Sequence, residues 1–174
     1  MKKPPQLELD ELDRKILARY QSDTRCTAES LGARVGLSTA AVHRRLKRMR
    51  EARVIEAEIA VIAPEAVGLP VSCVVEIDIE REGQADLDRF SARMLACSQV
   101  QQCFYVTGPF DFIVVVTVPD MTAYEAFTRE HLLSDPNVRS FTTHVVLKRV
   151  KTGLALPLGP TTADARTRSR RAAR

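Results

Sequence analysis

The N-terminal part of the chain is dominated by residues 27–49, which read TAESLGARVGLSTAAVHRRLKRM. Two helical patterns meet here across a short turn: the first follows Thr27 and ends at Gly36, and the second opens at Ser38. Threonine and serine cap helix N-termini, and glycine accepts the positive φ of a tight turn. Apolar residues return every three or four positions in the second pattern, as one buried helix face requires. We therefore predict a helix-turn-helix, whose second helix fits the major groove of DNA.

The flanking sequence extends this motif to a domain. Residues 9–20 place their apolar side chains on one helical face, with Asp10 in position to cap the N-terminus. Residues 54–63 alternate apolar and polar side chains, which predicts a β-strand and hence a winged helix-turn-helix domain over residues 1–63. Two prolines and a glycine in residues 64–70 predict a linker.

Residues 71–150 change to alternating strands and helices, in two similar halves joined by a tight hairpin. This order predicts a ferredoxin-like βαββαβ domain, with four antiparallel strands and both helices on one face, so the whole chain is α+β. Residues 112–118 are apolar on both faces, and we expect the sheet of a second subunit to cover the face without helices, giving an obligate dimer. The expected elements are residues 71–79, 84–97, 99–107, 111–118, a helix from about 120, and 138–150.

Charge is distributed unevenly along the 174 residues. Residues 1–63 carry net +4, residues 64–150 carry net −5, and residues 151–174 carry net +5. A basic end next to an acidic middle suggests that one end meets a polyanion. Residues 151–174 also have low complexity and many arginines, and we expect a disordered basic tail. No apolar run approaches the roughly 20 residues of a membrane helix, and no secretory signal opens the chain, so a cytoplasmic protein is expected.

The residue types that could form a metal site or a catalytic site are scattered along the sequence. The four cysteines lie at positions 26, 73, 97 and 103 without a Cys-x-x-Cys pair, and the three histidines lie at 43, 131 and 144. This spacing predicts neither a metal site nor a disulfide framework. No nucleophile–base set and no glycine-rich phosphate loop occurs, so we expect neither an enzyme nor a cofactor.

The second helix of the motif has the chemistry of a DNA-binding surface. Six Lys/Arg side chains occur among residues 43–53. Side chains in the first two turns reach base edges, and those farther along contact phosphates. A merely solvated basic face, or a protein–protein module, is the alternative interpretation. The candidate contacts with double-stranded DNA are Ser38, Thr39, Ala40, His43, Arg44, Arg45, Lys47 and Arg48.

Residues 7–150 resemble the Lrp/AsnC (leucine-responsive/asparagine regulator, feast/famine) family of transcriptional regulators. One departure concerns Arg53, where the family usually has glycine before its Val-Ile strand. The motifs that carry the resemblance are Leu9-Asp10-x-x-Asp13-x-x-Ile16-Leu17, Leu37-Ser38, Val42-x-x-Arg45-Leu46, Val54-Ile55, Val106-Thr107-Gly108-x-x-Asp111 and Thr142-x-x-Val145.

The resemblance implies a bacterial or archaeal, nucleoid-associated regulator that forms homodimers and often octamers. It also implies an effector, commonly an amino acid, in a cleft between dimers. Asp111 could accept from the effector's ammonium, and backbone amides around Gly108 could bind its carboxylate. A ligand-independent architectural protein that wraps DNA is the alternative. The effector-binding candidates are Gly108, Asp111, Met121, His144 and Val145.

Overall fold

The computed structural model describes residues 7–158 of the chain. The chain divides into two compact units. Unit 1 consists of Met1–Ala60 together with Thr152–Arg174, and unit 2 consists of Val61–Lys151. The two units are described separately below.

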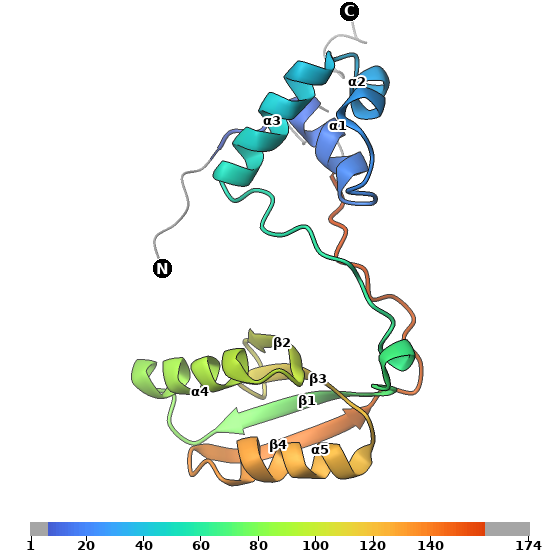
Figure 1. The fold of residues 1–174 in the computed structure, drawn as a ribbon. Coiled ribbons are helices and arrows are strands. Elements are labelled where there is room, and N and C mark those ends of the chain that lie inside the picture. The colour runs from blue at the N-terminus through green and yellow to red at the C-terminus, as the bar shows by residue number, and fades with distance from the viewer. Residues whose placement is uncertain (1–6, 159–174) are drawn as a thin grey trace, which may run out of the picture. The chain divides into compact units, whose positions relative to one another are not determined.

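The described residues of unit 1 form three helices, α1 (Glu11–Tyr20), α2 (Ala28–Val35) and α3 (Thr39–Glu51), as predicted (Figure 1). Each begins at a side chain that accepts a hydrogen bond from a free amide of the first turn: Asp10, Thr27 and Ser38. Eight buried apolar side chains from the three helices form the core of the unit.

The turn between α2 and α3 depends on two glycines. Gly36 ends α2 with φ 75°, a conformation that other residues adopt only with strain. A Cβ atom at Gly32 would overlap the carbonyl oxygen of Leu37, so the chain can approach the helix this closely only at glycine. The helix-turn-helix geometry is therefore fixed by the local sequence.

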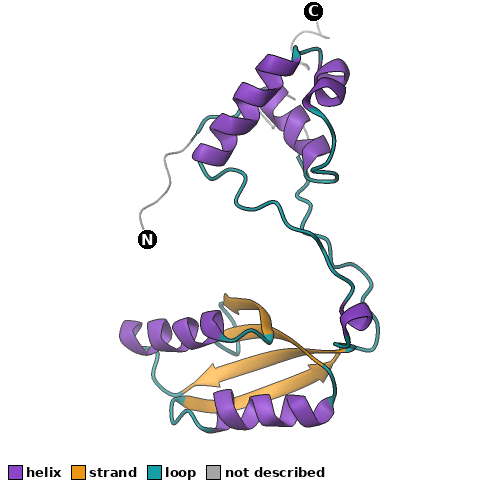
Figure 2. Ribbon diagram, in the orientation of Figure 1, coloured by secondary structure: helices purple, strands orange, loops and turns teal. Residues whose placement is uncertain are grey.

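The predicted strand over residues 54–63 does not form, and Figure 2 shows this stretch as a loop. A strand needs a hydrogen-bonded neighbour, and the described residues of unit 1 contain no other strand. Val54 and Ile55 pack, partly buried, against the core of unit 1, whereas the apolar side chains from Ala57 onward remain in solvent, with Val61 86% exposed. The described residues of unit 1 therefore form no wing. A 3₁₀-helix, Pro64–Val67, lies within the predicted linker.

Unit 2 has the predicted βαββαβ order and a four-stranded antiparallel sheet with strand order β2-β3-β1-β4. Its last helix continues into a π-helical turn, Arg129–Leu133, and its last strand ends five residues earlier than expected, at Val145. The elements are β1 (Val71–Ile79), α4 (Gln84–Ala96), β2 (Val100–Tyr105), β3 (Phe112–Val118), α5 (Met121–Thr128) and β4 (Val138–Val145).

Both helices of unit 2 cover the same face of the sheet. Alternate residues of β1 and β3 join side chains of α4 and α5 in one core of thirteen buried residues. The residues between them point to the other face, which is here called the open face. Its apolar side chains are only half-buried, and Phe104 is 50% exposed. They are Val74, Phe104, Ile113 and Val115.

The predicted disordered tail requires a correction at its start. Residues 152–158, here called the return segment, belong to unit 1 and contact it through the side chain of Gln21. The prediction for residues 159–174 lies outside the described residues. Within residues 7–158, no helix has the length and apolar character needed to cross a bilayer.

Candidate nucleic-acid interface and effector site

The outward face of α3 carries most of the predicted DNA contacts. Arg44 is exposed, and its side chain forms no hydrogen bond or ion pair with any residue in the described range 7–158. Lys47 makes only a long ion pair with Glu51, at 3.8 Å. The candidates that lie exposed at the start of α3 and along its outward face are Ser38, Thr39, Ala40, His43, Arg44 and Lys47.

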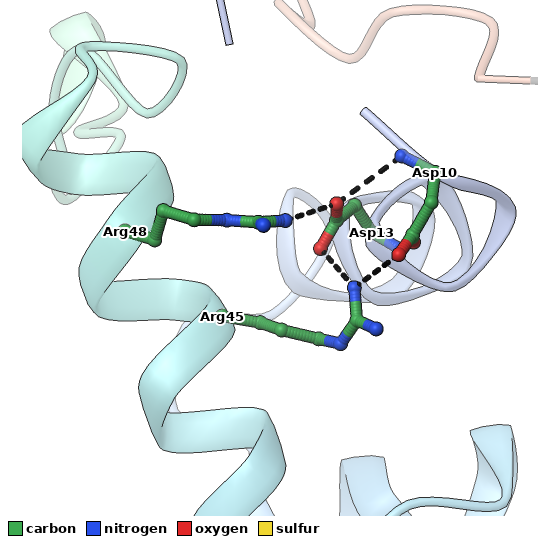
Figure 3. Close-up of polar contacts among 4 residues, drawn as sticks. All are labelled: Asp10, Asp13, Arg45 and Arg48. Atoms are coloured by element: carbon green, nitrogen blue, oxygen red, sulfur yellow. Dashed lines mark hydrogen bonds and ion pairs between the residues drawn. The ribbon is translucent and has the colours of Figure 1, made fainter. Parts of the chain in front are cut away.

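Two of the predicted DNA-binding arginines turn inward to α1 (Figure 3). A nitrogen of Arg45 lies 2.6 Å from Asp10 Oδ2 and 2.7 Å from Asp13 Oδ1. Arg48 reaches the other oxygen of Asp13, at 2.5 Å. Asp13 is fully buried, and the same oxygen, Oδ2, accepts from the Asp10 amide. We call these four residues the Asp13 network.

Within the Asp13 network, hydrogen bonds favour the charged forms of Asp10 and Arg45. Hydrogen bonds to Asp10 and Asp13 raise the pKa of Arg45 above its ordinary value. Burial raises the pKa of Asp10, but the Asp13 amide and the Arg45 guanidinium outweigh it, so the pKa lies below the ordinary value. Removing one partner of a buried pair leaves an uncompensated charge. The network therefore fixes the orientation of α3 against α1.

This geometry separates the candidates into two groups. The side chain of Arg45 is 20% exposed and makes both ion pairs inside the domain, so it orients α3 rather than extending from it. Arg48 is 45% exposed and keeps part of its guanidinium toward solvent. The sequence indicates that Asp13 is a buried partner for these arginines. Asp13 lies three and four positions before Ile16 and Leu17, which places it on the buried face of α1.

A second polar cluster lies at the C-terminal end of α3, and sequence reasoning missed it. Arg50 donates to Glu58 Oε1 and to the Tyr20 hydroxyl, both at 2.8 Å, and Tyr20 also bonds to Glu58. The hydrogen bond from Arg50 is the main cause that lowers the pKa of Glu58. The partners are 8 and 38 residues apart, and no local pattern predicts such a pairing.

The turn that follows α3 contains a residue in the left-handed backbone conformation. Arg53 has φ 54°, and its amide donates to Arg50 O at 3.0 Å. The next amide, of Val54, donates to Met49 O at 2.9 Å, which completes a Schellman motif. Glycine is the usual residue in this conformation, so the arginine found here re-forms the same turn with some strain.

Two of the predicted effector residues lie in the β2–β3 hairpin. Gly108 has φ 144°, in the region that glycine favours. Asp111 has a structural role, because its Oδ2 accepts from the Ile79 amide at 2.8 Å and its own amide donates to Ile77 O at 3.0 Å. Its Oδ1 makes no hydrogen bond to the described residues, 7–158, and can accept from a ligand.

The other three effector candidates lie at the opposite end of the sheet. Strand register places Val145 beside Cys73 of β1, and Met121 follows the strand whose end, Val118, pairs with Val71. Asp111 instead lies next to Ile77. Six residues of strand separate Ile77 from Val71, a distance of about 20 Å. Within one chain, the hairpin and Met121 are therefore too far apart to contact the same bound amino acid.

His144 lies on the open face, where its Nε2 is 3.5 Å from Glu76 Oε1. A hollow of about 320 Å³ between α4 and β2 is lined by none of the five effector candidates. Its lining includes Met94, Tyr105 and Phe112. No group of three or more potential metal ligands occurs between residues 7 and 158, and all four cysteines are free thiols.

Comparisons with known proteins agree with this architecture. Residues 9–50 match the AsnC-type helix-turn-helix domain, and residues 72–156 match the Lrp/AsnC ligand binding domain. The chain is 42% identical over 152 residues to the HTH-type transcriptional regulator y4tD of Sinorhizobium fredii, covering 87% of this chain and 90% of that protein. It is 34% identical over 150 residues to the leucine-responsive regulatory protein of Salmonella typhimurium, covering 86% and 92%.

Solved structures show the same fold. A transcriptional regulator of Neisseria meningitidis, crystallised as an L-Met complex, is 32% identical, with a TM-score of 0.80 over 87% of this chain and 97% of that one. An AsnC family transcriptional regulator from Agrobacterium tumefaciens is 31% identical, with a TM-score of 0.80 over 86% and 97%. Because both domains and these relatives agree, the chain belongs to the Lrp/AsnC family of DNA-binding transcriptional regulators, which are not enzymes.

Proposed function

We propose that this regulator reads double-stranded DNA with the first two turns of α3 and changes its assembly or DNA binding when an amino acid binds to unit 2. The observation that carries the DNA part is the contrast between two neighbours on α3. Arg44 extends freely into solvent, whereas Arg45 is engaged with Asp10 and Asp13. Ser38, Thr39, Ala40, His43 and Arg44 then face base edges, and Lys47 and Arg48 face phosphates.

The two adjacent arginines give a matched test of the interface. Arg44→Ala should weaken binding to a selected operator about 5- to 150-fold, the equivalent of about 1–3 kcal/mol, and relax sequence preference at one position. Arg45→Ala should instead destabilise unit 1. Fluorescence anisotropy on operator and random duplexes, with thermal unfolding of each variant, separates the two effects. Equal losses of Arg44→Ala on both duplexes would assign Arg44 to the phosphate backbone.

The proposal that an amino acid is the effector is supported by the β2–β3 hairpin and by two similar proteins. The Neisseria meningitidis regulator was crystallised as an L-Met complex, and the Salmonella typhimurium relative is named leucine-responsive. In this chain, the open oxygen of Asp111 is suited to an ammonium, and the backbone around Gly108 to a carboxylate. Because Met121 and Val145 lie at the far end of the sheet, we place the ligand where hairpin and strand ends of different subunits meet.

This arrangement requires a homo-oligomer. The open face is the apolar surface that fits a second copy, and we propose that two such faces pack together in a dimer, which then assembles further, to an octamer or another closed form. We further propose that the protein binds its DNA in the cytoplasm of a bacterium or archaeon, at the nucleoid.

A thermal-shift screen against the twenty amino acids tests the effector. An amino acid at a hundredfold excess over its Kd stabilises the folded protein by about 2.7 kcal/mol. Asp111→Asn should abolish the shift, because it removes the charge but keeps an oxygen for the Ile79 amide. A flat screen, together with uniform rather than phased footprints, would favour the ligand-independent architectural role.

A further inference from the structure

A hollow of about 350 Å³ lies in unit 1, between the last turn of α1, the α1–α2 turn and α2. Ala18 and the buried Leu31 supply its apolar lining. None of the candidate DNA-binding or effector-binding residues lines it. The lining side chains that carry a polar or ionisable group are Arg19, Ser22, Asp23, Cys26, Ser30 and Arg34.

The two arginines of the hollow have free hydrogen-bond donors. Arg19 lies in the last turn of α1 and Arg34 in the last turn of α2, where the helix dipole favours a cation without occupying its N–H groups. Both side chains are exposed, and within residues 7–158 neither forms a hydrogen bond or an ion pair. The hydroxyls of Ser22 and Ser30 are equally unpaired over the same range. The hollow therefore offers two kinds of donor to one ligand.

The one carboxylate in the lining is already balanced by an arginine outside it. Asp23 Oδ1 accepts from the Arg25 amide at 3.0 Å and from Arg25 Nε at 3.3 Å. The hydrogen bond from that amide is the main cause that lowers the pKa of Asp23 below its ordinary value. Because Arg25 balances this charge, the positive charges of Arg19 and Arg34 remain in excess, and the hollow attracts an anion.

The donors of the hollow fit a phosphate group better than a carboxylate. Arginine pairs with either anion through parallel N–H groups. A phosphate monoester carries about two negative charges at neutral pH and has three strong acceptor oxygens, whereas a carboxylate has a single charge and two oxygens. Two guanidinium groups and two hydroxyls therefore match the charge and the acceptors of a phosphate.

We propose that this hollow is a phosphate-binding site of unit 1, in which Arg19 and Arg34 pair with phosphate oxygens and the hydroxyls of Ser22 and Ser30 donate to them. The phosphate belongs either to the DNA backbone or to a free phosphorylated compound, and the recognition chemistry is the same. The proposal goes beyond the proposed function, because it concerns neither base readout by α3 nor the amino-acid site of unit 2.

Calorimetric titration of the full chain with inorganic pyrophosphate tests the site without DNA. Arg19→Gln and Arg34→Gln should each raise the Kd for pyrophosphate at least about fivefold, because each removes a charge-assisted pair. Asp23→Asn should lower the Kd about twofold, because it removes the carboxylate from the lining. Arg14→Gln, with the same loss of charge at a residue of α1 outside the lining, is the matched control and should leave the Kd unchanged.

DNA distinguishes the two sources of the phosphate. The protein with both Arg19→Gln and Arg34→Gln is titrated with a selected operator and with a random duplex at several salt concentrations. If the phosphates are those of DNA, the slope of log K against log salt should fall in magnitude by about 1.8 on both duplexes, about 0.9 for each contact. If the ligand is a free compound, pyrophosphate binding should weaken while both slopes stay the same. Unchanged pyrophosphate binding together with unchanged slopes, or equal changes in Arg14→Gln, would overturn the proposal.

Discussion

The two units of this regulator are stabilised by different means. Unit 1 combines a core of eight apolar side chains with Asp13, the one charged side chain that is buried among residues 7–158. Unit 2 encloses thirteen buried apolar side chains, without a buried charge in its described residues, and still leaves half-buried apolar side chains on its open face. The comparison teaches that a small domain depends on polar contacts for its geometry, whereas a sheet domain has apolar surface left for a partner.

The difference predicts that a charge on the open face affects assembly rather than folding. Val115→Lys places two lysines in the proposed dimer interface, and we expect the dimer Kd to rise at least about a thousandfold, about 4 kcal/mol. Sedimentation velocity should show monomers with a normal circular dichroism spectrum. Leu95→Lys, on α4 at a position 89% exposed, is the matched control and should remain dimeric. A dimer that survives Val115→Lys would place the interface elsewhere.

The same comparison predicts that unit 1 is sensitive at Asp13. Asp13→Ala leaves two arginines without their shared partner and removes one half of the capping box, so we expect unit 1 to lose about 3 kcal/mol of unfolding free energy. Hydrogen exchange of peptides from α1 and α3 measures this locally, while peptides of unit 2 stay unchanged. Glu8→Ala, at an exposed residue of the same charge, is the control. Equal effects of the two substitutions would show that the buried charge is dispensable.

Acid should weaken unit 1 through the same polar contacts. The pKa values of Asp10 and Glu58 are lowered in the folded chain, in Glu58 chiefly by the Arg50 hydrogen bond. A carboxyl group with a lowered folded pKa adds stability above its unfolded pKa, and that stability is lost as pH falls through the folded pKa. Urea unfolding should therefore give a constant free energy near neutral pH and a falling one below about pH 4.5. Glu58→Gln should flatten this fall, and an unchanged profile would contradict the assignment.

The smallest expected effect concerns the turn after α3. Arg53→Gly relieves the left-handed conformation, and we expect a gain of about 0.5–1 kcal/mol in the unfolding free energy. Arg53→Ala removes the same side chain without relieving the backbone and should give no gain. Thermal unfolding of both variants makes the comparison. The same change in both would show that the side chain, rather than φ, determines the effect.

Much of the fold follows from local sequence. The helix starts at Asp10, Thr27 and Ser38, the turn at Gly36, and the βαββαβ order were all predicted, because caps, glycine turns and apolar periods act over a few neighbouring residues. The candidate DNA surface followed in the same way from basic residues on the outer face of a capped helix.

The sequence alone also predicted too much order in one place and too little in another. Residues 54–63 have a strand's alternation, but a strand forms only with a neighbour, which unit 1 lacks within residues 7–158. The return segment has no apolar period, yet Gln21 and the core of unit 1 hold it. The spacing of apolar residues shows which face of a segment is apolar. It does not show which other residues of the fold contact that segment.

Apart from residues 54–63, the sequence by itself determined where the α-helices and strands form, and which helix carries the basic face. Only the tertiary structure decided that Arg45 turns inward while Arg44 does not, and that Asp111 lies far from Met121. Both helical arginines have the same local chemistry. The difference is made by Asp13, 32 residues away, and contacts of that separation arise only when the packed helices bring a buried charge and its partner together.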